Sequence, residues 1–292
     1  MTVLKTVLGD YPETAPIKSG ALTLSGAELA FTDYPRPYHG AFKPMVNEQA
    51  FDISEMAIVT LLIARSFGRP LHLLPAVMLG RLQHRQAAVR SDLDLASPAA
   101  LSGLRIGMRS WAQTTVTWLR GILLCDHGAD FSGVTWIKTE DSHVPEAPDP
   151  SRHAPEGTTL EGMLAAGNLD VVLGLEAKVG VNRPLFSPDP DAAARDWLAR
   201  HGCVPINHMI CVTEDLVAHH LDELVEFYGL LQQGKAAAPW TGSGPDPKPM
   251  GFEANRASVE LLIRYMTALG LLPRPITYDD LIDPRIRAAI GD

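Results

Sequence analysis

The chain has 292 residues, of which 46% are hydrophobic, and its 25 basic and 34 acidic residues give a formal net charge of -9. A chain of this length can bury one large core or two of ordinary size, and we expect two lobes. The acidic balance, without a Lys- or Arg-rich run that could follow a phosphate backbone, argues against nucleic acid as a partner.

The N-terminal stretch MTVLKTVLGDYPETAP reaches Asp10 and Pro12 before any apolar run of signal-peptide length. No later segment approaches the ~18 consecutive apolar residues that a membrane span requires. We therefore expect a cytoplasmic protein without a membrane partner.

The first third of the chain predicts strands followed by a helix. Residues 3–8 (VLKTVL) predict a strand, and the alternation in GALTLSGAELAF, punctuated by Gly20 and Gly26, predicts a hairpin. Residues 44–68 carry apolar side chains at helical spacing, which predicts one helix, and LHLLPAVM then predicts a short strand.

The middle of the chain, roughly residues 90 to 203, alternates helical and strand patterns, which is typical of βαβ units around a parallel sheet. Two short strand patterns, HRQAAVRSD and INHMICVTED, bracket it. If both cross between lobes, the chain leaves lobe one, builds lobe two and returns. We therefore predict an α/β protein in which residues 1–88 and 208–292 form lobe one. Residues 89–207 form an inserted lobe two, with a ligand cleft between the lobes.

The last third predicts helices. Residues 214–232 are amphipathic, which predicts one long helix whose apolar face could support self-association. A loop rich in Gly and Pro leads to a final helix, ASVELLIRYMTALG. Asn255 and Arg256, just before this stretch, either reach the cleft or cap the final helix, and the capping role is favoured.

The run RLQHR places Arg81, His84 and Arg85 next to the first crossing strand. A guanidinium can hold a carboxylate by charge-assisted hydrogen bonds, and an imidazole titrates near neutral pH. The alternative is a solvated loop whose cations add solubility. We favour a functional role because three such groups lie within five residues.

The run GMRSWAQTTVTWLRG predicts a strand end, a polar turn and a helix whose first turn offers Ser110, Thr114 and Thr115. Free N–H groups at a helix N-terminus, supplemented by hydroxyls, can bind a carboxylate or phosphate. An ordinary serine N-cap explains the same residues equally well.

Two further residues allow either a structural or a catalytic role. His208, in PINHMIC, is either a core histidine or an acid that flanks the cleft opposite His84. Glu55, in FDISEM, falls on the predicted helix, where it is either a capping partner or a catalytic carboxylate, and the capping role is favoured. No His or Cys spacing predicts a metal site.

Seven stretches, taken in order and spacing, resemble the 4,5-dihydroxyphthalate decarboxylase family, which has the type II periplasmic binding protein-like fold. They are LGDYPET, FDISEM, HRQAAVRSD, LSGLRIGMRSWAQTT with WLRGIL, TLEGMLAAGNLDVVL, VPINHMICV and GFEANRASVELLIRYMTALGLL.

The resemblance implies a carboxy-lyase of aromatic compound catabolism, which removes one carboxylate from a hydroxylated, phthalate-like substrate as CO2 without oxidation. It implies His84 or His208 as the proton donor and Arg81 and Arg85 as the carboxylate clamp. Further substrate contacts would come from Ser110, Trp111, Thr114, Thr115 and Glu55. No organic cofactor is implied, and a divalent metal ion stays open.

One departure concerns the clamp, because Gln83 precedes His84 and Arg85 follows it, whereas family members often place an Arg directly before the His. The substrate could therefore be another aromatic or small carboxylate. Two alternatives share the fold: a non-catalytic solute-binding protein for a small carboxylate, and another lyase such as a chorismate dehydratase-like enzyme. The EANR segment favours the decarboxylase.

Overall fold

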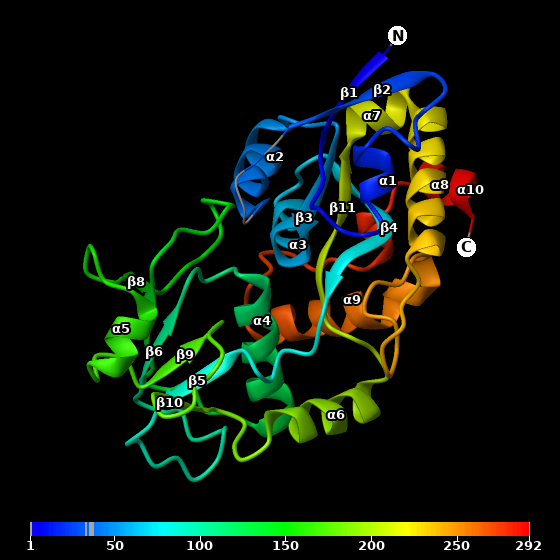
Figure 1. The fold of residues 1–292 in the computed structure, drawn as a ribbon. Coiled ribbons are helices and arrows are strands. Elements are labelled where there is room, and N and C mark those ends of the chain that lie inside the picture. Colours follow the sequence, from blue (N-terminus) through cyan, green and yellow to red (C-terminus); the bar gives the residue numbers. More distant parts are fainter. Residues whose placement is uncertain (1, 33, 35–37, 292) are drawn as a thin grey trace. The chain divides into compact units, whose positions relative to one another are not determined.

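The chain forms two compact units in the computed structural model (Figure 1). Unit 1 comprises Met1–Gly80, Ile206–Ile263 and Leu272–Asp292, and unit 2 comprises Arg81–Pro205 and Arg264–Leu271. The structure describes residues 2–32, 34 and 38–291. Each unit contains one sheet with helices, which confirms the predicted α/β class.

Unit 1 is built on a five-stranded mixed sheet. Its strands, in spatial order, are β2 (Ala27–Phe31), β1 (Thr2–Val7), β3 (Ile53–Ala57), β11 (Ile206–Thr213) and β4 (Leu71–Gly80). Strand β1 pairs in parallel with β2 and β3, whereas β11 runs antiparallel to β3 and β4. Every residue of the central strand β3 is buried, so this strand is covered on both faces.

The helices of unit 1 are α1 (Ala15–Lys18), η1 (Tyr38–Ala41), α2 (Phe42–Glu48), α3 (Ile58–Ser66), α7 (Glu214–His219), α8 (Leu221–Ala237), η3 (Asp279–Leu281), α10 (Pro284–Ile290) and most of α9 (Phe252–Ala268). Helix α3 buries eight of its nine residues, as expected of a helix that is apolar on all sides. Within the described residues, no helix has both the length and the apolar character to cross a bilayer.

Unit 2 is built on a six-stranded sheet. Its strands, in spatial order, are β10 (Asn182–Pro184), β5 (Ala87–Arg90), β9 (Val171–Leu173), β6 (Arg105–Met108), β7 (Thr135–Lys138) and β8 (Arg152–His153). The strands β9, β6, β7 and β8 run parallel, as the βαβ pattern predicts. Its helices are α4 (Thr114–Gly121), the π-helical turn η2 (Ile122–Asp126), α5 (Leu160–Ala165) and α6 (Pro190–His201).

The carboxylate of Asp126 connects three segments of unit 2. Its Oδ2 accepts hydrogen bonds from Trp197 Nε1 at 2.7 Å and from Tyr265 Oη at 2.6 Å. Trp197 lies on α6 and Tyr265 near the end of α9. The π-helical turn is therefore held by side chains from both helices.

Two predictions for the first third of the chain are wrong. GALTLSGAELAF forms no hairpin, because only Ala27–Phe31 is a strand and it pairs in parallel with β1. Residues 44–68 form not one helix but the end of α2, then β3, then α3. Gln49 ends α2 in the left-handed conformation (φ 50°). The buried strand β3, ISEMA, has no alternation of apolar and polar residues, so periodicity alone cannot distinguish it from a helix.

The predicted helix over residues 214–232 is interrupted. Its pattern is divided between α7 and α8 because His220 leaves the helical conformation, with φ -139° and ψ 39°. Helix α8 then continues to Ala237, and its buried face includes Leu224, Phe227 and Leu231. The amphipathic face expected to support self-association is thus largely covered within unit 1.

A glycine in α8 tests this packing. Any Cβ at Gly234 would overlap the backbone carbonyl oxygen of Glu13, whereas a Cβ at Gly229 in the same helix would meet no atom within 4 Å. We expect Gly234→Ala to destabilise the protein by about 1–3 kcal/mol because backbone must move. Gly229→Ala should stabilise it by up to about 1 kcal/mol through helix propensity. Denaturant unfolding of the two variants measures both effects, and equal effects would contradict the packing of α8.

Candidate active site

A buried carboxylate and a histidine form a close pair in unit 1. Glu55 Oε1 lies 2.6 Å from His208 Nδ1. The Glu55 side chain is 1% exposed, whereas that of His208 is 23% exposed. Nε2 of His208 makes no hydrogen bond within the described residues. The imidazole is therefore anchored through one nitrogen, and the other can exchange a proton.

The sheet register brings these two side chains together. On β3 and β11, Glu55 pairs with Ile210 and His208 pairs with Ala57. Because side chains on a strand alternate between faces, His208 is the diagonal neighbour of Glu55 on one face. The ring of Phe42, from α2, meets the imidazole edge to face at 5.2 Å between ring centroids. The imidazole is thus oriented by a hydrogen bond and by an aromatic contact.

The turn after β1 supplies two more donors to Glu55. Tyr11 Oη donates to Oε1 at 2.7 Å, and the backbone N–H of Gly9 donates to Oε2 at 2.9 Å. A Cβ at position 9 would overlap the Tyr11 ring and would lie 2.7 Å from Glu55 Oε2. Glycine is therefore required there for the backbone to approach the carboxylate this closely.

The pKa of Glu55 is lowered. Burial by itself raises the pKa of this carboxyl, but the hydrogen bond and charge of His208, together with the donors Tyr11 and Gly9, outweigh it. Glu55 is consequently an anion at neutral pH, and its carboxylate holds the His208 ring in place through Nδ1.

A cation and a threonine meet at the start of α4 in unit 2. Arg81 Nη2 donates to Thr115 Oγ1 at 3.2 Å. In the described part of the chain, no carboxylate lies within ion-pair distance of Arg81. Burial lowers the pKa of this guanidinium, and Glu176 opposes the shift. Arg81 therefore has donors left with which to bind an external anion.

Arg85, the other predicted clamp residue, has its charge neutralised within unit 2. Its Nε donates to Asp191 Oδ1 at 2.5 Å, its Nη2 contacts Asp191 Oδ2, and its Nη1 lies 3.4 Å from Glu176 Oε1. The hydrogen bonds that Arg85 donates to Asp191 raise the pKa of its guanidinium. Arg85 and Arg81 are four residues apart, but they have different partners: Arg85 binds carboxylates, whereas Arg81 binds a threonine.

His84 is fully buried, at 0% exposure, in unit 2. Its ring packs on Phe186 at 4.7 Å and on Trp197 at 6.2 Å between centroids. Neither of its nitrogens has a hydrogen-bond partner in the described residues. Burial lowers the pKa of His84 to about 4, and the charges of His127 and Arg200 act in the same direction. The imidazole is therefore neutral at physiological pH.

The four predicted residues from 110 to 115 are all buried, but they do not share one helical turn. Thr114 and Thr115 begin α4, whereas Ser110 and Trp111 lie in the turn before it. Of the two alternatives for this run, the serine cap is wrong, because Gln113 is the N-cap residue and makes no side-chain capping bond.

Glu55 also departs from its predicted setting. It lies on strand β3 rather than on a helix, so it caps no helix. Sequence reasoning missed Tyr11 as its partner and missed Arg120, whose guanidinium packs 3.7 Å from the Trp111 ring centroid. The available signal for Tyr11 was its place in the stretch LGDYPET.

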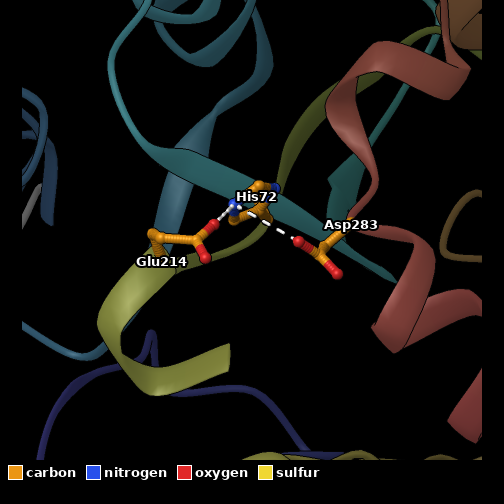
Figure 2. A group of neighbouring side chains, drawn as sticks. All are labelled: His72, Glu214 and Asp283. Carbon is orange, nitrogen blue, oxygen red and sulfur yellow. Dashed lines mark hydrogen bonds and ion pairs between the residues drawn. The ribbon is translucent and has the colours of Figure 1, made fainter. Parts of the chain in front are cut away.

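Three groups in unit 1 have the chemistry of metal ligands (Figure 2). They are His72 on β4, Glu214 on α7 and Asp283 before α10, and their ligand atoms lie within 4.8 Å of one another. No sequence spacing predicts this set, because its members are far apart in the chain. Arg285 already bridges the carboxylates, with Nη2 at 2.5 Å from Glu214 Oε1 and 2.8 Å from Asp283 Oδ2. Its guanidinium supplies the charge that a metal ion would bring.

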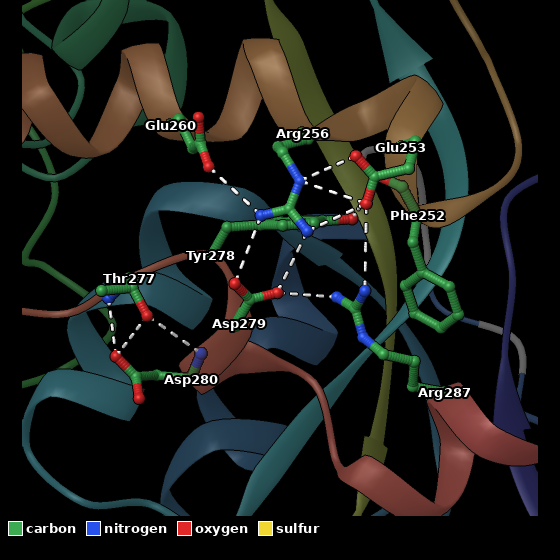
Figure 3. Close-up of polar contacts among 9 residues, drawn as sticks. All are labelled: Phe252, Glu253, Arg256, Glu260, Thr277, Tyr278, Asp279, Asp280 and Arg287. Carbon is green, nitrogen blue, oxygen red and sulfur yellow. Dashed lines mark hydrogen bonds and ion pairs between the residues drawn. The ribbon is translucent and has the colours of Figure 1, made fainter. Parts of the chain in front are cut away.

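Neither Asn255 nor Arg256 caps a helix. Asn255 Nδ2 donates to the carbonyl of Gly251, and Arg256 bonds to Glu253, Glu260 and Asp279 (Figure 3). Arg256 thereby joins α9 to η3, and its charge is fully compensated. The capping role favoured for this pair is wrong.

The pKa of Glu55 predicts a pH-dependent contribution to stability. A carboxyl whose folded-state pKa is lowered stabilises the fold above its unfolded-state pKa, and this contribution is lost as pH falls through the folded-state value. We expect Glu55→Gln to cost about 1–3 kcal/mol at pH 7, because buried donors lose a charged acceptor. The cost should shrink as the pH falls below about 4.5, because the unfolded glutamate then binds a proton while folded Glu55 is still ionised.

Thermal melting from pH 7 to pH 3 measures this difference. Glu48→Gln, at an exposed position of α2, serves as the matched control and should change the melting temperature little at any pH. A difference between wild type and Glu55→Gln that stays constant with pH would contradict an ionised Glu55.

Known proteins resemble the chain in sequence or in fold. No protein-family model matches the chain. It is 28% identical over 241 residues to a 4,5-dihydroxyphthalate decarboxylase of Comamonas testosteroni, covering 74% of this chain and 70% of that protein. It is 29% identical over 211 residues to a 4,5-dihydroxyphthalate decarboxylase of Pseudomonas putida, covering 66% of this chain and 80% of that protein.

Solved structures show the fold. The alkanesulfonate-binding protein SsuA from Xanthomonas axonopodis pv. citri superposes with a TM-score of 0.56 at 14% identity, covering 97% of this chain and 98% of that one. The desulfurization enzyme DszB superposes with a TM-score of 0.53 at 16% identity, covering 100% and 99%. The two-lobed type II periplasmic binding protein-like fold is thus confirmed, and the chain is similar in sequence to two 4,5-dihydroxyphthalate decarboxylases, as its sequence motifs predict.

Proposed function

We propose that the protein is a carboxy-lyase that removes a carboxylate from a hydroxylated, phthalate-like aromatic acid as CO2. The observation that carries this proposal is the pair formed by buried, ionised Glu55 and partly exposed His208, 2.6 Å apart. Such a pair keeps an imidazole in one orientation with its second nitrogen partly exposed, as a proton donor to carbon requires. The two decarboxylase relatives support the reaction class.

In the proposed reaction, His208 Nε2 delivers its proton to the ring carbon that bears the leaving carboxylate. A ring hydroxyl para to this carbon supplies electron density for the new C–H bond. The bond from the ring to the carboxylate then breaks, CO2 leaves, and the electron pair of that bond restores aromaticity. His208 is left neutral and regains a proton from solvent, so the net reaction consumes one proton and releases one CO2.

We assign the donor role to His208 rather than to His84. A general acid must hold a proton near the working pH and must reach the substrate. His84 has a pKa of about 4 and no exposed surface, whereas His208 is anchored by an anion and is partly exposed. Glu55 and Tyr11 are then positioning residues, which act through the imidazole.

We assign carboxylate binding to Arg81, with Thr115 beside it at the start of α4. The guanidinium has donors left, and the N–H groups of the first turn of α4 add positive potential beside it. Arg85 is not part of this assignment, because Asp191 and Glu176 already compensate its charge. The reaction needs no organic cofactor. The expected cytoplasmic location remains a prediction.

A test of the donor uses CO2 release from a panel of hydroxylated phthalates and benzoates. We expect His208→Ala to lower kcat by about 10²–10⁴-fold, the usual contribution of a general acid, with a smaller change in KM. His84→Phe, which keeps an aromatic ring against Phe186, should retain turnover. Loss of turnover in His84→Phe with full turnover in His208→Ala would reverse the assignment. Ligand-induced stabilisation without CO2 from any substrate would favour a solute-binding protein instead.

A test of the carboxylate site compares two arginines of the same segment. Arg81→Met should raise KM by about 10–100-fold, which corresponds to the loss of a charge-assisted hydrogen bond. Arg85→Met removes an equal charge from an exposed ion pair and should leave KM near the wild-type value. Steady-state kinetics on one substrate decides between them, and equal effects of both substitutions would mean that only net charge matters.

A further inference from the structure

Arg120 in α4 is a buried cation without a compensating anion. It is 1% exposed, among the most deeply buried large side chains of the protein. Its Nη2 donates to the carbonyl of Trp111 at 2.7 Å, but Nε and Nη1 have no partner within the described residues. Burying a charge is costly unless it is paired and hydrogen-bonded. The guanidinium therefore needs an anion that the described residues do not provide.

The acids of unit 2 do not meet this requirement. Asp149 is the acid whose charge raises the pKa of Arg120, against the larger effect of burial, which lowers it to about 9. Yet Asp149 is already bound, through Oδ2 to Lys138 Nζ at 2.9 Å and through Oδ1 to the backbone N–H of Ser151 at 2.9 Å. Arg120 remains charged at neutral pH, and its stack on Trp111 compensates that charge only in part.

Other polar atoms of the same helix are also unsatisfied. Gln113 Oε1, Thr114 Oγ1 and Thr117 Oγ1 are buried without a hydrogen-bond partner in the part of the chain described. Gln113, Thr117 and Arg120 follow at intervals of four and three residues, so they share one face of α4. Each buried polar atom without a partner needs an explanation. Here such atoms cluster in the eight residues 113–120.

We propose that Arg120 binds a small monoanion, a carboxylate group or a halide, at the N-terminal end of α4. The guanidinium reaches back to that end, because it contacts both the carbonyl and the ring of Trp111, three residues before Thr114. The Arg120 donors supply the charge, the hydroxyl of Thr117 supplies a further donor, and the helix N-terminus adds its own positive potential. This site lies at the same end of α4 as the carboxylate site proposed for Arg81 and Thr115, but it does not involve His208.

The test measures anion binding without any catalytic assay. The melting temperature and tryptophan fluorescence are recorded while sodium chloride, sodium acetate or sodium benzoate is added to wild type, Arg120→Met and Thr117→Val. Because ionic strength acts alike on all three proteins, the difference from Arg120→Met isolates the bound anion. Bromide and iodide provide a second readout, since a halide held beside Trp111 quenches its fluorescence saturably.

We expect a saturable response in wild type that is lost in Arg120→Met. In Thr117→Val, which removes one hydroxyl and keeps the side-chain shape, the anion dissociation constant should rise about tenfold. A response to benzoate alone supports the proposal and identifies an aryl carboxylate, and a response to chloride and acetate identifies a small free anion. Identical responses of wild type and Arg120→Met to every salt would overturn the proposal that Arg120 binds an anion.

Two points keep the outcome decisive. Replacing a buried, uncompensated charge by an apolar side chain of similar length is tolerated in many proteins, so Arg120→Met should fold, and its circular dichroism checks this. If it does not fold, Thr117→Val and the halide quenching of wild type decide instead. His208→Ala should keep the anion response, so a failure of the proposed reaction leaves this result intact.

Discussion

The hydrogen bond between Glu55 and His208 is the interaction on which the rest of the chemical account depends. A buried carboxylate is costly unless several donors surround it. Here three donors come from two segments: His208 lies on β11, and Tyr11 and Gly9 lie in the turn after β1. Two pairings of the sheet, β1 with β3 and β3 with β11, are therefore needed to build the pair. The fold of unit 1 and the proton chemistry proposed for it have the same origin.

The cations of unit 2 are distinguished by what already neutralises them. Arg85 and Arg105 bind carboxylates of their own unit, Asp191 and Asp170, and are structural. Among the described residues, the Arg81 side chain has a threonine as its hydrogen-bond partner, and that of Arg120 has a carbonyl and the rings of Trp111 and Trp136. A guanidinium without a carboxylate is the group that can gain most from an external anion. An arginine of unit 2 is therefore assigned a structural role when a carboxylate already pairs with it, and a binding role when none does, whatever motif it lies in.

Much of the fold follows from the sequence, because the alternation in unit 2 and the strands LHLLPAVM, QAAV and INHMICV are strongly patterned. Strand β3 was missed because a strand buried on both faces lacks the alternation that marks a strand. His208 and Glu55 were each recognisable as candidates, but their contact depends on the register of β3 with β11, which no local pattern encodes. Likewise, the burial of His84 and Arg120 depends on aromatic residues distant in the chain, such as Trp197 and Trp136.

The central claim, that His208 gives the proton, is tested most directly by chemical rescue. His208→Ala leaves a space beside Glu55 that free imidazole can enter, and Glu55 can orient the added imidazole as it orients the side chain. We expect CO2 release by His208→Ala to rise with imidazole concentration towards saturation, and to rise much less in the double variant that also carries Glu55→Gln. Wild-type turnover by His208→Ala in the absence of imidazole would contradict the account.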